Sequence, residues 1–89
     1  MTRDEIEATT NRVFEESFEV ESATLRPGAN LFADLGLDSL DTVDLVVALQ
    51  KAFGVRIRDD ARVRGIRTLG DVYDYIEALK TEGVTPNRD

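Results

Sequence analysis

One stretch decides the fold: Asp34-Leu35-Gly36-Leu37-Asp38-Ser39-Leu40-Asp41-Thr42-Val43-Asp44-Leu45. Pro27-Gly28 precedes it as a loop signal, and Gly36 permits a positive φ angle that other residues avoid. Residues 40–53, in contrast, contain neither Gly nor Pro and repeat apolar side chains at helical spacing. We therefore expect a helix from about Ser39 to Phe53, with Asp38 or Ser39 as its N-cap. A serine at this position is fully explained by capping unless other features indicate a further role.

The helix expected over residues 39–53 has apolar side chains on two sides. An ordinary core stripe consists of Leu45, Val46, Leu49 and Phe53, and a second stripe, rotated away from it, of Leu40, Val43 and Val47. Asp41 and Asp44 border the second stripe and need water or basic partners rather than burial. This pattern favours a partner docked on the second stripe. In the alternative interpretation, the preceding loop covers Leu40 and Val43.

Composition excludes several classes of function. The 89 residues make one domain, which we place at residues 1–83, followed by a flexible tail at 84–89. Without cysteine or histidine the chain has no disulfide, no thiolate metal site and no histidine base, which argues against an enzyme. Any thiol chemistry must use a sulfur from outside the chain. The net charge of −7 disfavours nucleic acid and favours partners with basic surfaces.

We expect neither a membrane span nor an export signal in these residues. No apolar run approaches the roughly 20 residues that span a bilayer, and the first five residues lack the apolar segment of a signal peptide. We expect a monomeric cytoplasmic protein. The aspartates at 34, 38, 41 and 44 do not have the spacing of a calcium-binding loop, so we expect no metal site.

The remaining segments predict helices with one long connection. Thr2 to Glu5 has the form of a capping box and opens a first helix that ends near Phe18. Residues 19–38 form a loop, with a type II turn at Pro27-Gly28. Apolar residues that can anchor this loop are Leu25, Leu31, Phe32 and Leu35.

The second half of the chain predicts a short helix and a long one. Gly54 suits the end of the helix over residues 39–53, and Asp59-Asp60 can cap a short helix that reaches Arg64. Thr68 to Asp71 opens a last helix that ends at Gly83; its inward face is Leu69, Val72, Tyr73, Ile76 and Leu79. The fold class is therefore all-α, a small bundle of three longer helices and one short helix.

The stretch around Asp38-Ser39-Leu40, taken with residues 34–46, resembles the modification site of acyl carrier proteins of fatty-acid and type II polyketide synthesis. The resemblance extends over about residues 6–79. It implies that Ser39 carries a 4′-phosphopantetheine arm, which a phosphopantetheinyl transferase takes from coenzyme A. It also implies that the thiol of the arm holds acyl intermediates as thioesters and that the chain is a carrier, not a catalyst.

The resemblance further implies where partners and cargo bind. The helix over residues 39–53 matches the recognition helix of the family, read by acyl-transfer, condensing and modifying enzymes with basic docking surfaces. The implied partner-binding residues are Asp38, Leu40, Asp41, Val43, Asp44 and Val47. Family members can shelter an acyl chain between their second and third helices, and the residues expected to line that space are Leu49, Ile57, Ile66 and Tyr73.

Two segments depart from the family pattern. Gln50 and Lys51 stand where the recognition helix is usually acidic, and residues 56–67 hold five arginines, at 56, 58, 62, 64 and 67. These arginines form either a solvated face with weak surface ion pairs or a surface for a changed set of partners. A specialised polyketide, lipid or other secondary pathway is favoured at least as much as housekeeping fatty-acid synthesis. An aminoacyl or peptidyl carrier and an unmodified helical adaptor remain as alternatives.

Overall fold

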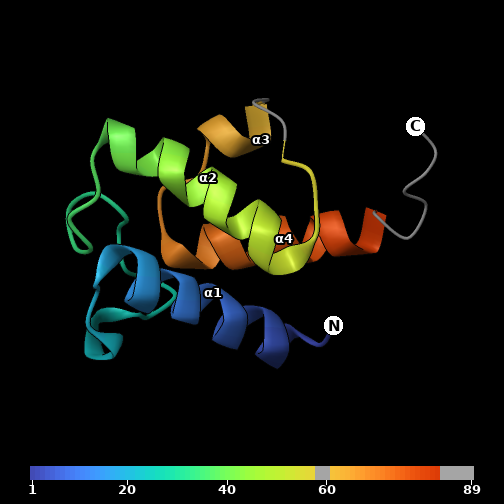
Figure 1. Cartoon of the computed structure of the whole chain (residues 1–89), viewed down its shortest axis with the longest axis horizontal. Coiled ribbons are helices and arrows are strands. Elements are labelled where there is room, and N and C mark those ends of the chain that lie inside the picture. Colours follow the sequence, from blue (N-terminus) through green and yellow to red (C-terminus); the bar gives the residue numbers. More distant parts are fainter. Residues whose placement is uncertain (58–60, 83–89) are drawn as a thin grey trace.

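Three long helices and one short helix make up the computed structural model, which describes residues 1–57 and 61–82 (Figure 1). Their bounds are α1 Arg3–Phe18, α2 Ser39–Phe53, α3 Ala61–Arg64 and α4 Leu69–Glu82, with a single 3-10 turn, η1 Ser22–Thr24, in the long loop. The described residues contain no strand, only an isolated bridge between Asn30 and Thr68. The predicted all-α bundle and its long first connection are confirmed.

Both ends of α1 follow from local chemistry. The Thr2 hydroxyl accepts a hydrogen bond from the Glu5 amide, and the Glu5 carboxylate accepts one from the Thr2 amide, which completes the predicted capping box. At the other end Glu19 adopts a left-handed conformation (φ 55°) that ends the helix. Between them α1 turns Ile6, Thr10, Val13 and Phe14 into the bundle.

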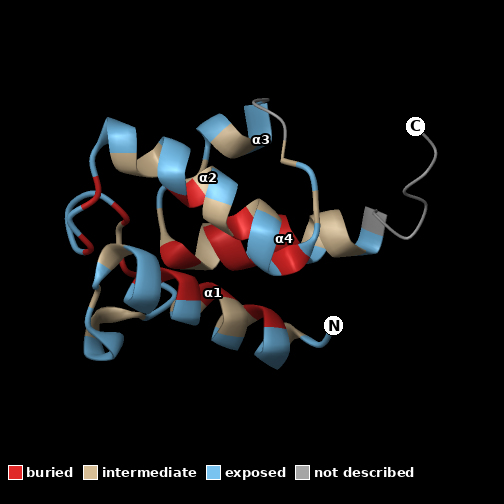
Figure 2. Ribbon diagram, in the orientation of Figure 1, coloured by how far each residue is buried: buried red, intermediate tan, exposed pale blue. Residues whose placement is uncertain are grey.

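The core lies where α1, α2 and α4 face one another, as the buried (red) parts of the ribbon in Figure 2 show. On α4 the side chains of Leu69, Val72, Tyr73 and Ile76 are buried as predicted, and Leu79 is half-buried. Arg3 joins α1 to α4 at the edge of this core, because its guanidinium contacts Asp74 at 2.9 Å and Glu77 at 2.7 Å. The three long helices thus form one packed unit.

The long loop is anchored to the bundle, although not by all the predicted residues. Leu31 and Leu35 are buried and Leu25 is half-buried, but Phe32 is 42% exposed, so its prediction as an anchor was wrong. Phe32 follows the inward-pointing Leu31 directly, and the turn that starts at Asn30 directs the two side chains apart. Ala29 and Leu37 are buried anchors that the sequence reading missed.

The loop also hydrogen-bonds to the start of α4. The Leu31 amide donates to the Arg67 carbonyl, the Leu69 amide to Ala29 and the Gly70 amide to Pro27. The approach at Gly70 is so close that a Cβ atom there would lie 2.9 Å from the Pro27 carbonyl oxygen. These contacts fix the path by which the chain enters α2.

The turn at Pro27-Gly28 differs from the predicted type. The Ala29 amide donates to the Arg26 carbonyl at 2.9 Å, which closes a turn, but Gly28 does not have the positive φ angle that a type II turn requires. The close pairing of this segment with α4 accounts for the difference. The predicted cap at Asp59-Asp60, the predicted helix end at Gly83 and the tail at 84–89 lie outside the described residues. None of the described helices has the length and apolar character needed to cross a membrane.

Candidate functional site

The start of α2 shows which residue caps the helix. The Asp38 carboxylate accepts a hydrogen bond from the Asp41 amide at 2.9 Å, and the Asp41 carboxylate accepts one from the Asp38 amide at 3.0 Å. Asp38 is therefore the N-cap, and Ser39 is the first residue of the helix. Ser39 is exposed, and capping does not account for its hydroxyl. The simplest structural explanation for this serine is thereby removed.

The end of the long loop fixes the position of the start of α2. Gly36 has the predicted positive φ angle, 76°, and the Leu37 amide donates to the Leu31 carbonyl at 3.0 Å. Leu37 is buried, whereas Ser39, two residues later, is exposed. A buried anchor next to an exposed hydroxyl presents that hydroxyl at a fixed place on the surface.

The second stripe of α2 is open to solvent. Leu40 is 77% exposed, Val43 62% and Val47 45%, whereas Leu45 in the core stripe is 5% exposed. The loop therefore does not cover Leu40 and Val43, and the interpretation that it does was wrong. Asp38 and Asp44 beside the stripe are exposed, and Asp41 is half-buried. An apolar stripe bordered by carboxylates suits a partner surface with an apolar pocket and a basic rim.

A cavity of about 280 Å³ lies between α2, α3, α4 and the long loop. Three of the four residues expected to line an apolar space, Leu49, Ile57 and Ile66, do line it. Its wall is mostly apolar, and Val63 and Tyr75 belong to it although the sequence reading missed them. The spacing of Val72 and Tyr75, three residues apart on α4, is the signal that could have found Tyr75.

Tyr73 does not line this cavity, so its predicted place there was wrong. Its ring is fully buried on the side of α4 that faces α1, and its hydroxyl donates a hydrogen bond to the Asn11 side chain. Burial raises the pKa of the Tyr73 hydroxyl, because the charged form would lose its hydration. Residues two positions apart on a helix point in nearly opposite directions, so Tyr75 reaches the cavity and Tyr73 cannot.

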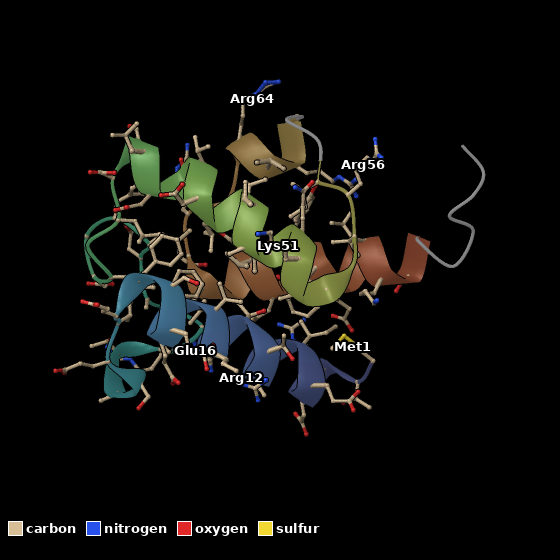
Figure 3. All side chains as sticks on the ribbon, in the orientation of Figure 1. Met1, Arg12, Glu16, Lys51, Arg56 and Arg64 are labelled. Carbon is tan, nitrogen blue, oxygen red and sulfur yellow. The ribbon has the colours of Figure 1, made fainter. Side chains whose placement is uncertain are left out.

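Two arginines of the segment 56–67 lie apart from the acidic start of α2. Figure 3 shows Arg64 on α3 pointing away from the bundle and Arg56 beside the segment that leads to α3. Arg58, the second of the five predicted arginines, lies outside the described residues. Among the residues that the structure describes, no group of three or more acidic side chains is placed to hold a metal ion.

Comparisons with known proteins agree with this arrangement. Residues 12–76 match the family model described as a phosphopantetheine attachment site. The chain is 44% identical over 80 residues to an acyl carrier protein of Prochlorococcus marinus (strain MIT 9515), covering 90% of this chain and 99% of that protein. It is 39% identical over 79 residues to acyl carrier protein 2 of Ralstonia nicotianae (strain ATCC BAA-1114 / GMI1000), covering 89% and 96% respectively. The chain therefore belongs to the acyl carrier proteins, a family of phosphopantetheine-bearing carriers rather than enzymes.

Proposed function

We propose that Ser39 is the residue that accepts the 4′-phosphopantetheine arm and that α2 presents this arm to partner enzymes. One observation carries the proposal. Asp38 and Asp41 form the capping box of α2 with each other, so the neighbouring Ser39 hydroxyl is exposed and is not needed to cap the helix. When bound, the arm supplies the thiol that a chain without cysteine lacks, and that thiol carries acyl groups as thioesters.

The surroundings of Ser39 fit an attached phosphodiester. Ser39 is the first residue of α2, and the backbone amides of this first turn have no helical carbonyl to which they can donate. The helix dipole also favours a negative charge there. The carboxylates of Asp38 and Asp41 oppose that charge, but their capping hydrogen bonds hold them in fixed positions. The exposed site can be reached by a modifying enzyme without unfolding the helix.

We further propose that the exposed stripe of α2 is the docking surface for the transferase and for the acyl-transfer, condensing and modifying enzymes. Leu40, Val43 and Val47 would enter apolar pockets, while the carboxylates of Asp38, Asp41 and Asp44 meet Lys or Arg side chains at the rim. Exposed ion pairs raise association rates more than affinity, which suits a carrier that visits several enzymes in turn. A monomer keeps this stripe free, and the expected monomeric, cytoplasmic state belongs to the same proposal.

The cavity behind α2 is our proposed shelter for the acyl chain. Its apolar wall, which includes Leu49, Ile57 and Ile66, favours hydrocarbon, and its volume of about 280 Å³ exceeds that of a cavity able to hold benzene, about 150 Å³. The cargo would serve fatty-acid, polyketide or related lipid biosynthesis. The positive charge of the segment 56–67 makes a specialised pathway at least as good a candidate as general fatty-acid synthesis.

Intact-mass measurement after treatment with a phosphopantetheinyl transferase and coenzyme A tests the attachment site. We expect the unsubstituted chain to gain the mass of one phosphopantetheine group and Ser39→Ala to gain none. Ser22→Ala, which removes another exposed serine, is the matched control and should be modified normally. Circular dichroism confirms that all three proteins are folded.

Two results would contradict the proposal. A mass gain that persists in Ser39→Ala would place the attachment at another residue. Failure of the unsubstituted chain to gain mass with several transferases would leave an unmodified helical adaptor as the better description.

A further inference from the structure

The cavity behind α2 is apolar except at its edge. The polar side chains among its lining residues are Thr42, Arg64, Arg67 and Tyr75, and of these the two arginines carry a charge. The Thr42 hydroxyl already donates to the Ser39 carbonyl at 2.6 Å, and the Arg64 side chain points away from the bundle (Figure 3). Arg67 is therefore the cation best placed to act on something that enters the cavity.

Arg67 is exposed, but hydrogen bonds hold its backbone and one nitrogen of its side chain. Its amide donates to the Asp71 carboxylate at 2.9 Å, and its carbonyl accepts from the Leu31 amide at 2.9 Å. In the side chain, Nη1 donates to the Arg64 carbonyl at 2.7 Å and to the Ile66 carbonyl at 3.1 Å. Both of these bonds use the same nitrogen, and within residues 1–57 and 61–82 Nε and Nη2 donate no hydrogen bond, although the guanidinium charge also interacts with the Asp71 carboxylate.

A fixed guanidinium beside an apolar cavity changes which cargo binds there. An oxygen carried into an apolar space loses its bound water, which is unfavourable unless a donor replaces that water. Arginine remains charged at all working pH values and offers forked donors to carbonyl, hydroxyl and carboxylate oxygens. Because Nη1 is already bound, little further side-chain freedom is lost when the other donors engage a ligand.

We propose that Arg67 makes the cavity select acyl chains that bear an oxygen, such as 3-oxo chains, over saturated chains of the same length. This inference rests on the proposed function, since the chain must first carry cargo on Ser39. A purely structural role is the competing explanation, because the two bonds from Nη1 also satisfy carbonyls at the end of α3. That role does not depend on the cargo, so the two explanations predict different results.

The test uses the full chain with its phosphopantetheine arm, loaded with octanoyl or 3-oxooctanoyl groups. Hydroxylamine cleaves the exposed thioester, and the rate of cleavage reports how well each cargo is sheltered. We expect Arg67→Gln to accelerate cleavage of the 3-oxooctanoyl form about tenfold, the loss of one hydrogen bond to a charged group, and to leave the octanoyl form within about twofold. Comparing variants with the same cargo cancels the intrinsic reactivity of each thioester.

Two further variants complete the design. Arg67→Lys keeps the charge but not the forked donors, so it should retain part of the discrimination. Arg56→Gln removes an exposed charge that does not line the cavity and should change neither rate. Methyl chemical shifts of Ile57 and Ile66 show whether the cargo enters the cavity.

Each remaining outcome is decisive. Equal acceleration of both cargoes in Arg67→Gln would show that Arg67 only supports α3, and no acceleration of either would exclude any role toward cargo. Both results would overturn this inference and leave Ser39 as the attachment site. If the unsubstituted chain forms no phosphopantetheine-bearing protein, the proposed function fails and the inference fails with it.

Discussion

The two apolar stripes of α2 are alike in composition and opposite in surroundings. Leu45, Leu49 and Phe53 are buried against the other helices, whereas Leu40, Val43 and Val47 face solvent. Burial of a leucine side chain contributes about 1.5–3 kcal/mol to stability, so the first stripe is explained by folding alone. The second stripe gains nothing of this kind in the isolated chain. The difference separates what folds the protein from what we propose it uses to meet its partners.

A pair of leucine truncations tests this separation most strongly. We expect Leu45→Ala to lower the free energy of unfolding by about 2–4 kcal/mol, because it leaves a cavity in the core. Leu40→Ala, the same change in the exposed stripe of the same helix, should alter it by less than about 0.5 kcal/mol. Urea denaturation followed by circular dichroism measures both values. Similar losses for the two variants would show that the exposed stripe is part of the fold.

Charge reversal beside the exposed stripe tests the proposed docking surface. We expect Asp44→Lys to lower kcat/KM for modification by a phosphopantetheinyl transferase about tenfold, since the transferase should meet this carboxylate with a basic side chain. Stability should not change, because Asp44 is exposed. Glu16→Lys is the matched control: it makes the same change of charge on α1, across the molecule from the start of α2 (Figure 3). An equal fall in both variants would indicate a general effect of net charge instead of docking at α2.

The features that the sequence predicted well are those that depend on neighbouring residues. The capping boxes at Thr2 and Thr68, the N-cap of α2, which was expected at Asp38 or Ser39, and the end of α2 at Gly54 follow from local backbone chemistry, and the structure contains all four. The exposed stripe was also predictable, because helical spacing separated it from the core stripe.

Features that depend on how the elements rotate against one another were not predictable in the same way. Apolar residues lie on two sides of α4. The sequence alone therefore did not reveal that Tyr73 faces α1 while Tyr75 faces the cavity. The prediction for Phe32 failed for a related reason, because an apolar loop residue packs against the bundle only if the backbone directs its side chain inward. The guanidinium bonds of Arg67 depend on where the end of α3 lies, which no local pattern specifies.

The comparison extends to the N-termini of α2 and α4, which have similar capping boxes in different settings. Asp71 at the start of α4 accepts backbone N–H bonds from Arg67 and Thr68, and these bonds lower the pKa of its carboxyl group. A lowered pKa means that the stabilisation is present above the unfolded-state value and is lost as the pH falls toward the folded-state value. We expect Asp71→Asn to be less stable by about 0.5–1 kcal/mol at neutral pH.

The same substitution should flatten the pH dependence of stability. Unfolding free energies measured between about pH 6 and pH 3 should fall less steeply for Asp71→Asn than for the unsubstituted chain. Asp38→Asn at the start of α2 is the comparison, because the Asp38 carboxylate accepts from a single amide within its own helix. Equal flattening by the two variants would show that the additional bond from the Arg67 amide does not make stability more sensitive to acid.

Thr10 is the opposite case to the exposed apolar stripe of α2, because it is a polar residue inside the core. Its side chain is fully buried on α1, and in the described part of the chain its hydroxyl oxygen has no hydrogen-bond partner. Thr10→Val replaces that hydroxyl with a methyl group of similar shape, so it should raise the free energy of unfolding by up to about 1 kcal/mol. In a domain of this size this corresponds to a rise in Tm of about 4–8 °C.

A series at this position separates the hydroxyl from the methyl group. Thr10→Ser keeps the unsatisfied hydroxyl and removes the packed methyl group, so it should be less stable than the unsubstituted chain by about 1 kcal/mol. If Thr10→Val is more stable and is still modified by the transferase at the normal rate, the buried Thr10 hydroxyl lowers the stability of the fold and has no role in modification. The exposed apolar stripe of α2 would then be the feature that the stability of the fold does not explain and that requires a partner. A less stable Thr10→Val would instead show that the hydroxyl has a partner in solution, and burial would then account for Thr10 as it accounts for Leu45.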